Sequence, residues 1–212
     1  MVKILLIRHG QSEANLAGFF AGQMDSPTTA LGEHQASCVA KYIAENYKVN
    51  AIYSSDLQRA AVVGNAVAGK TGAPLYFDSR LREINSGKWQ GLSFEKLIAE
   101  YPSYQVWLHD IGNAHCDGGE SVSQMQMRVL SVVKEIAQKY PNQTVVITTH
   151  ATPIRALQCC CDGKSLSDMK DVPWVSNSSI TELIYGNDSF SFGKIGCDEY
   201  LADAVSRFPN TV

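Results

Sequence analysis

Residues 2–15 read VKILLIRHGQSEAN, a short apolar run that ends in an arginine, a histidine and a glycine. Such a run is typical of a strand buried in a parallel sheet. We expect it to carry Arg8 and His9 to the carboxyl edge of that sheet, where α/β proteins build their sites. Gly10 has no Cβ, so it lets the chain turn and brings backbone amides close to the imidazole. An imidazole beside a guanidinium indicates phosphate chemistry, whereas a single histidine at a strand end is more often structural.

The bulk properties of the chain exclude several classes of protein. Its 212 residues suffice for one domain with a full core, and 45% hydrophobic and 18% charged residues are ordinary for a globular protein. The net charge is -3 and the lysines and arginines are not clustered, which argues against a nucleic-acid partner. No segment approaches the roughly 18 apolar residues of a membrane span, and the first apolar run lacks a signal-peptide pattern. We therefore expect a cytoplasmic protein with no nucleic-acid or membrane partner.

Six cysteines are present, and their spacing does not suggest a metal site. Residues 159–161 are three adjacent cysteines, which cannot all face one way on a helix. No C-x-x-C pair or histidine–cysteine ligand spacing accompanies them. We expect reduced thiols, no metal and no organic cofactor.

Strand and helix patterns alternate along most of the chain. Apolar runs predict strands at residues 2–7, 51–55, 75–77 and 144–149. Helical spacing predicts helices at about residues 29–47, 57–69, 94–101 and 122–140, and another with Pro153 in its first turn. Residues 178–185 and 190–195 read as a hairpin. Either Ser54 or Ser55 is expected to cap the second helix.

This alternation predicts an α/β fold, specifically a three-layer sandwich. Its central sheet is expected to be mainly parallel, with an antiparallel edge and helices on both faces. We assign residues 1–212 to one catalytic domain, in which residues 85–120 form a lid or an irregular insertion.

Chemically active side chains follow several of the expected strands. His150 ends a second buried strand, Arg59 lies one turn into a helix after another strand, and Glu83 lies in the loop after a third. If they meet Arg8 and His9, the arginines grip phosphate oxygens while a neutral histidine attacks phosphorus. The carboxylate then moves the proton of the ester oxygen. The surrounding cations are expected to hold the pKa of His9 low.

Six motifs follow one another in the chain. They are Arg8-His9-Gly10 with Asn15; Gly22 and Asp25 with Leu31, Gly32, Gln35 and Ala36; Ser55-Asp56-Leu57-Gln58-Arg59-Ala60; Leu81-Arg82-Glu83 with GKWQG at 87–91; GGES at 118–121; and Thr149-His150 with IRAL at 154–157. In this order they make the chain, from about residue 3 to 185, resemble the histidine phosphatase superfamily, also called phosphoglycerate mutase-like. Each motif alone is weak, but the set is specific.

The resemblance implies a role for each matching position. The catalytic positions are Arg8, His9, Arg59, Glu83 and His150, and the substrate- or phosphate-binding positions are Arg8, Asn15, Gly22, Gln23, Arg59, His150 and Ala151. It implies that His9 becomes a phosphohistidine while Arg8, Arg59 and His150 bind the phosphoryl group. Glu83 would protonate the leaving oxygen and then deprotonate water. The implied partner is a small phosphate ester. The oligomeric state is left open, with a homodimer as one candidate.

Three positions depart from the family pattern. Ala151 replaces the usual glycine after the second histidine, which could restrict the approach of the backbone to phosphate. Val63 replaces a threonine and Thr28 replaces a leucine, and neither change is expected to affect the chemistry.

The resemblance leaves three functions open. The first is a metal-independent phosphomonoester hydrolase acting on a small phosphorylated metabolite, and the second is a phosphoglycerate mutase with the same catalytic residues. Family mutases typically carry a glutamate-arginine-x-tyrosine-glycine run where this chain has Glu83-Ile84-Asn85-Ser86-Gly87. They are also typically longer in the segment between the glutamate and the second histidine. Both differences favour the hydrolase. The third is a non-catalytic phosphate-binding module, which the retention of all five catalytic positions disfavours.

Loop residues near the expected site have two interpretations. The aromatic and histidine side chains either line a substrate pocket or close the core, and they are Trp89, Trp107, His109, His115 and Trp174. Glu120 either contacts substrate or fixes its loop, whereas Glu13 and Glu33 are expected at the surface.

Overall fold

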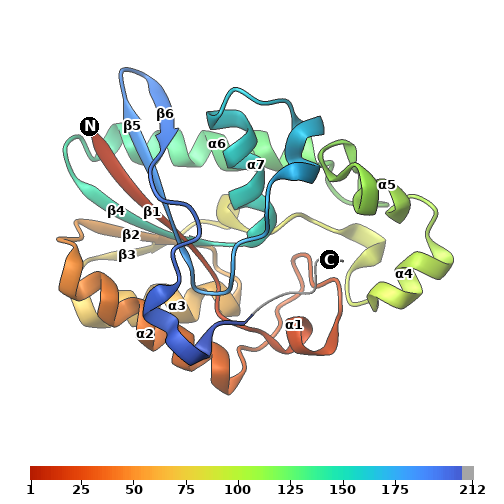
Figure 1. Ribbon diagram of the computed structural model, residues 1–212, viewed down its shortest axis with the longest axis horizontal. Helices are drawn as coiled ribbons and strands as arrows, with labels where there is room; N and C mark the ends of the chain where they lie inside the picture. The colour runs from red at the N-terminus through yellow and green to blue at the C-terminus, as the bar shows by residue number, and fades with distance from the viewer. Residues whose placement is uncertain (207–212) are drawn as a thin grey trace.

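A six-stranded sheet forms the centre of the computed structural model, which describes residues 1–206 (Figure 1). Its strands are β1 (Val2–Arg8), β2 (Ala51–Ser54), β3 (Leu75–Phe77), β4 (Thr144–Thr149), β5 (Ile180–Gly186) and β6 (Ser189–Phe192). They lie in the order β3-β2-β4-β1-β5-β6. The first four are parallel, and β5 and β6 add an antiparallel edge. The predicted fold class is therefore confirmed, although both hairpin strands differ by a few residues from their expected bounds.

The register of the two central strands determines where the site lies. β1 and β4 pair in parallel, with Leu5 opposite Val146 and Arg8 opposite Thr149. The residue that follows each strand is a histidine. Because parallel strands in this register end at the same level, His9 and His150 leave the sheet side by side at its carboxyl edge.

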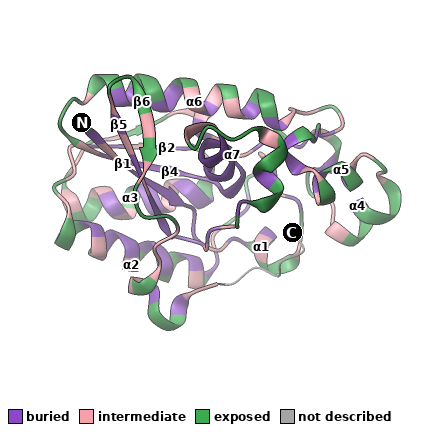
Figure 2. Cartoon of the chain, turned by 45° about the horizontal axis from the view of Figure 1, so that its top comes forward, coloured by how far each residue is buried: buried purple, intermediate pink, exposed green. Residues whose placement is uncertain are grey.

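Helices cover both faces of the sheet (Figure 1). The longest are α2 (Ala30–Asn46), α3 (Gln58–Thr71), α6 (Val122–Lys139) and α7 (Ala151–Cys161). Side chains of β1 alternate between the two faces. Leu5 and Ile7 pack with α2 and α3, whereas Ile4 and Leu6 pack in the core beneath α6 and α7. Buried residues accordingly fill the sheet and the inner sides of the helices (Figure 2).

The helix boundaries follow local capping. Thr29, Ser93 and Ser121 accept backbone amides as N-caps, and at Ser121 a reciprocal bond with Gln124 completes a capping box. Helix α7 begins at Ala151, so Pro153 occupies its first turn, where a missing amide hydrogen leaves no helical bond unmade.

Three short helices lie beyond the edge at which β1 ends (Figure 1). They are α1 (Glu13–Ala17), α4 (Phe94–Glu100) and α5 (Tyr104–His109), of which α1 and α5 were not expected from the sequence. The segment 85–120 contributes Trp89, Tyr104 and Trp107 to the main hydrophobic core. Its role as a lid stays a prediction, and its inner side is part of the packed structure. Residues 207–212 of the predicted domain lie outside the described residues, and no helix among residues 1–206 is long and apolar enough to cross a membrane.

Candidate active site

His9 is buried at the end of β1 with one ring nitrogen already bonded. Its Nδ1 lies 2.7 Å from the carbonyl oxygen of Gly10, and a carbonyl oxygen only accepts. Nδ1 therefore carries the hydrogen of the neutral ring, and Nε2 keeps its lone pair. A Cβ on Gly10 would lie 2.5 Å from the carbonyl oxygen of Gly32, so only glycine fits this turn. The local backbone thus fixes the orientation of the ring and leaves Nε2 as the nitrogen with a free lone pair.

The surroundings of His9 keep it neutral. Burial is the largest cause that lowers the pKa of His9 well below its usual value, and the positive charges of Arg59 and Arg8 lower it further. The expected direction of this pKa shift is correct, but desolvation contributes more than the cations that the sequence suggested. A neutral imidazole at physiological pH retains the lone pair that nucleophilic attack requires.

Two buried arginines supply the positive charge of the site. Arg59 donates from Nη1 to the carbonyl oxygen of Met24 at 2.9 Å and from Nη2 to that of Gly22 at 2.8 Å. Arg8 donates from Nη1 to the carbonyl oxygen of Val175 at 2.5 Å. Burial lowers the pKa of Arg8 to about 9 and that of Arg59 to about 10, partly offset by Glu83. Both arginines therefore remain cationic at neutral pH and attract a phosphate dianion.

His150 lies beside His9, with 5.2 Å between the ring centroids. Its Nε2 is 2.8 Å from the hydroxyl of Ser55, which also accepts the amide of Leu57 at 3.3 Å. Nδ1 of His150 is buried and has no hydrogen-bond partner among the described residues. If the Ser55 hydroxyl donates to Nε2, then Nδ1 carries the hydrogen and can donate to a phosphoryl oxygen.

Ser55 does not have the capping role expected for it or for Ser54. The N-cap of α3 is Leu57, which makes no side-chain bond. The Ser55 hydroxyl lies instead between α3 and His150. Burial, followed by the charge of Arg59, lowers the pKa of His150 well below its usual value, so this ring too is neutral.

Glu83 reaches the site from the loop after β3. Its Oε1 accepts the amide of Ile84 at 2.8 Å, and its Oε2 accepts the amide of Thr152 at 3.4 Å. Thr152 lies in the first turn of α7, the helix that begins at the residue after His150. The carboxylate thus lies at the start of the same helix that follows the second histidine.

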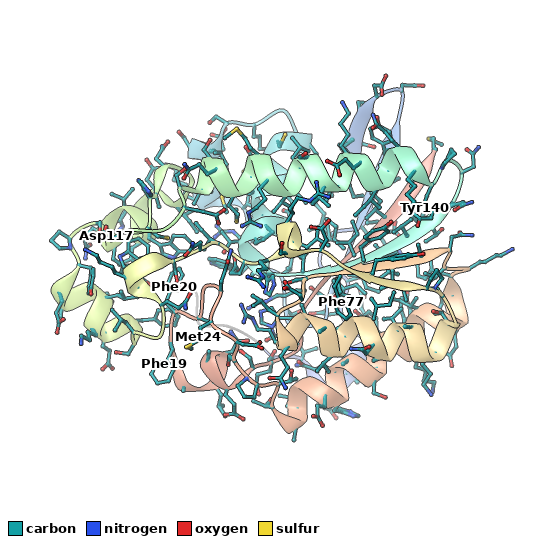
Figure 3. All side chains as sticks on the ribbon, turned by 180° about the vertical axis from the view of Figure 1, so that it is seen from behind. Phe19, Phe20, Met24, Phe77, Asp117 and Tyr140 are labelled. Carbon is teal, nitrogen blue, oxygen red and sulfur yellow. The ribbon has the colours of Figure 1, made fainter. Side chains whose placement is uncertain are left out.

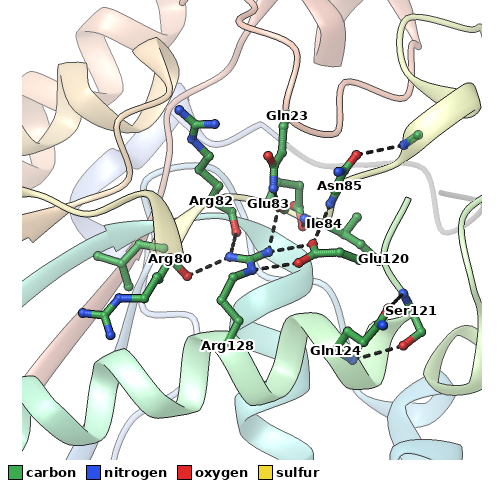
Figure 4. Close-up of polar contacts among 12 residues, drawn as sticks. Gln23, Arg80, Arg82, Glu83, Ile84, Asn85, Glu120, Ser121, Gln124 and Arg128 are labelled. Atoms are coloured by element: carbon green, nitrogen blue, oxygen red, sulfur yellow. Dashed lines mark hydrogen bonds and ion pairs between the residues drawn. The ribbon is translucent and has the colours of Figure 1, made fainter. Parts of the chain in front are cut away.

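Arg128 of α6 holds the segment that carries Glu83 (Figure 4). It donates to the carbonyl oxygens of Arg80, Arg82 and Glu83, at 2.7, 3.1 and 3.3 Å. Two further bonds, at 2.8 and 2.9 Å, join it to the carboxylate of Glu120. Glu120 also accepts the amide of Asn85 at 2.8 Å. Of the two roles considered for Glu120, the structure therefore agrees with the one that fixes the loop.

The remaining predicted positions differ in how close they lie to the site. Asn15, Gly22 and Ala151 line the same cavity as His9, whereas Gln23 does not. The side chain of Gln23 donates to the carbonyl oxygen of Glu83 at 3.0 Å and thereby joins two loops. Gly22 has a φ of 52°, and a Cβ there would lie 2.0 Å from the Ser86 hydroxyl, which explains the glycine. Among the lining residues, Ala151 begins α7, so its Cβ borders the cavity beside the helix amides.

The cavity above His9 has a volume of about 520 Å³. Its phosphate-site wall includes Arg8, His9, Asn15, Arg59 and Glu83, and its outer wall is mostly apolar. The outer wall consists of Leu16, Phe19, Phe20, Phe94, Glu95, Ile98, Trp107 and Trp174, with small residues between them. Figure 3 shows Phe19 and Phe20 beside the segment that carries α4 and α5.

Only some of the loop residues expected near the site line this cavity. Trp107 and Trp174 do so, whereas Trp89 is buried in the core and contacts the ring of Trp107 edge-on. His109 and His115 are exposed and lie outside the cavity wall. Both interpretations of the tryptophans therefore apply, and Trp107 fits both because it lines the cavity and also belongs to the main hydrophobic core. Among residues 1–206, no cluster of three or more histidine, cysteine, aspartate or glutamate side chains is arranged to hold a metal.

Three supporting residues were missed from the sequence. Ser55 is part of the Ser55–Ala60 motif, which was noted but given only a capping role. Arg128 lies within a long helix and carries no sequence signal. Asn177 donates to the carbonyl oxygen of His9 at 2.9 Å from a loop before β5, and nothing in its neighbourhood marks it. Such residues act through contacts distant in sequence, which periodicity does not report.

Comparison with known proteins places this site in a family. A model of the histidine phosphatase superfamily (branch 1) matches residues 4–198. The chain belongs to this superfamily. Phosphoserine phosphatase 1 of Hydrogenobacter thermophilus is 32% identical over 168 residues, which cover 79% of each chain. The probable phosphoglycerate mutase GpmB of Escherichia coli is 31% identical over 161 residues, which cover 74% of this chain and 73% of that protein.

A solved structure agrees with this chain over nearly its whole length. The structure of Bacillus stearothermophilus YhfR superposes with a TM-score of 0.90 and 26% identity, covering 95% of this chain and 100% of that chain. The predicted superfamily and its phosphatase character are therefore confirmed, and relatives of the mutase type also exist.

Proposed function

We propose that this histidine phosphatase hydrolyses small phosphate monoesters through a phosphohistidine on His9. The observation that carries the proposal is the 2.7 Å contact of Nδ1 with the Gly10 carbonyl, which leaves Nε2 as the unprotonated nitrogen. Two buried guanidiniums and two neutral imidazoles line or adjoin the space where a phosphoryl group would lie. This charge distribution favours a dianion and a transition state with charge on its equatorial oxygens.

In the first step, Nε2 of His9 forms a bond to phosphorus as the bond from phosphorus to the ester oxygen breaks. Protonated Glu83 gives its proton to the departing oxygen, and the alcohol leaves. Arg8, Arg59 and Nδ1 of His150 stabilise the phosphoryl oxygens during the transfer.

In the second step, a water molecule attacks the phosphorus of the phosphohistidine. The Glu83 carboxylate takes a proton from that water, and the bond from phosphorus to Nε2 breaks. Inorganic phosphate leaves, and both His9 and Glu83 return to their starting protonation states.

The test measures phosphate released by the wild-type protein and by His9→Ala from a panel of small phosphomonoesters, without added metal. Brief incubation with a ³²P-labelled ester, followed by alkaline denaturation, should retain label on the wild-type protein because phosphohistidine survives alkali and is lost in acid. The His9→Ala protein should neither release phosphate nor retain label. Equal phosphate release by both proteins would refute the role of His9.

A phosphoglycerate mutase is the second candidate, favoured by the 31% identity to GpmB. The two activities share the first step and differ in whether water or a second hydroxyl takes the phosphoryl group. Conversion of 3-phosphoglycerate to 2-phosphoglycerate with negligible phosphate release would favour the mutase. The cytoplasmic location, the absence of a cofactor and the homodimer stay predictions.

A further inference from the structure

We propose that the substrate is a phosphate monoester of an uncharged apolar alcohol, aliphatic or aromatic, rather than one that carries a carboxylate. This inference rests on the proposed phosphatase function and names the substrate class of the same site. The inference follows from the side chains that form the outer wall of the cavity.

Large apolar side chains stand exposed at the mouth of the cavity. Leu16 of α1 is 67% exposed, Phe19 is 40% exposed and Ile98 of α4 is 52% exposed. All three line the cavity that contains His9. Covering such side chains with an apolar group is favourable because it removes their surface from water.

The deeper part of the outer wall is aromatic. The ring of Phe20 packs edge-on against Trp107, with 4.8 Å between centroids, and against Phe94 at 6.3 Å. On another part of the wall, Trp174 lies under the guanidinium of Arg155 at 4.0 Å from the ring centroid. Aromatic faces and edges of this kind suit an alkyl chain or an aryl ring.

Backbone hydrogen bonds hold the rim in place. The amide of Phe20 donates to the Leu92 carbonyl at 2.9 Å, and the amide of Gly91 donates to the Phe20 carbonyl at 2.9 Å. The amide of Phe94 donates to the Gly18 carbonyl at 3.2 Å. These bonds join the segment after α1 to the start of α4, so an apolar ligand finds a formed wall.

The charges on the outer wall are unfavourable for a carboxylate. Beyond the phosphate-site residues, the only charged side chain among the described lining residues is Glu95, which is an anion. Arg8 and Arg59 lie buried in the phosphate-site wall, where they donate to backbone carbonyls. A carboxylate on the alcohol would thus lose water without gaining a cation and would be repelled by Glu95.

The experiment compares three esters whose alkoxides have similar basicity: ethyl phosphate, hexyl phosphate and 6-phosphonooxyhexanoate. We expect kcat/KM for hexyl phosphate to exceed that for ethyl phosphate at least about tenfold, because each buried methylene is worth about fourfold, or about 0.8 kcal/mol. It should also exceed that for the carboxylated ester at least about tenfold.

A matched pair of variants tests whether the wall causes this preference. Ile98→Lys adds a cation at the cavity mouth and should raise the kcat/KM of the carboxylated ester relative to hexyl phosphate at least about fivefold. Met127→Lys adds the same charge at a side chain that is 61% exposed on α6 and does not line the cavity. It should change the ratio less than about twofold.

The outcomes separate the two proposals. Equal or faster hydrolysis of the carboxylated ester by the wild-type protein would overturn the substrate class and leave the phosphatase intact. An equal response to both lysine variants would overturn the role of the outer wall. No phosphate release from any ester, together with no acid-labile label on His9, would overturn the proposed function and this inference with it.

Discussion

The two ends of the cavity differ in burial, charge and origin. At the phosphate-site wall and beside it, His9, Arg59 and His150 are buried. His9 is held by the carbonyl of the adjacent Gly10, whereas Arg59 and His150 are held by backbone or hydroxyl groups distant in sequence. At the outer wall, Leu16 and Ile98 are largely exposed and lie on short helices beyond the sheet. In the function proposed above, the chemistry depends on strand register and fixed contacts, whereas substrate choice depends on a surface that can change with little cost to the fold.

The largest expected effect comes from removing the nucleophile. His9→Ala should lower phosphate release by at least about 10⁴-fold, because no other group can form the covalent intermediate. Its thermal unfolding should stay cooperative, which circular dichroism checks. Residual activity within tenfold of the wild type would show that hydrolysis does not proceed through His9.

Removal of the Arg128 side chain should lower kcat, although Arg128 does not line the cavity. Arg128→Ala frees the segment that carries Glu83, and misplacement of a catalytic group by about 1 Å is worth up to about 10²-fold in rate. The expected signature is a fall in kcat with a smaller change in KM. Arg80→Ala is the matched control, because its guanidinium pairs with Asp78 and Glu135 away from the cavity. Similar losses in both variants would contradict the positioning role.

Ser55→Ala should cost about tenfold in kcat/KM, since it removes the hydroxyl that orients His150. Ser54→Ala removes a neighbouring buried hydroxyl that bonds to Thr148 at 2.7 Å and does not touch His150. The control should lose stability without a comparable loss of kcat/KM. If the two variants behave alike in kcat/KM, Ser55 has no role beyond packing.

The smallest effect concerns stability against pH. His9 and His150 have folded-state pKa values below the unfolded value of about 6.5, so the unfolded chain binds more protons below that pH. Stability should therefore fall as the pH drops from about 6.5 toward 5, by up to about 1.4 kcal/mol per pH unit for each histidine. Urea unfolding in phosphate-free buffer measures this slope, which His150→Gln should reduce. A flat profile over this range would mean that the two rings are not held neutral by the fold.

The residues at the phosphate end were predictable because their signals are local. Arg8 and His9 end an apolar strand, His150 ends a second strand, and Arg59 lies in a helix that follows a third. Their convergence required only that parallel strands end at one edge, and the pairing of Arg8 with Thr149 provides that alignment. Gln23 was placed in the site by family resemblance, yet it lies outside the cavity wall and joins two loops instead.

The sequence by itself determined the α/β fold, the family and the residues proposed as catalytic, because strand periodicity and short motifs are encoded by neighbouring positions. Only the tertiary structure decided that Gly10 orients His9, that Ser55 contacts His150 and that Arg128 holds the Glu83 segment. It also decided that Leu16, Phe19 and Ile98 surround the same space. These contacts join positions tens of residues apart or depend on a particular backbone geometry, so they exist only once packing has fixed the distances between elements.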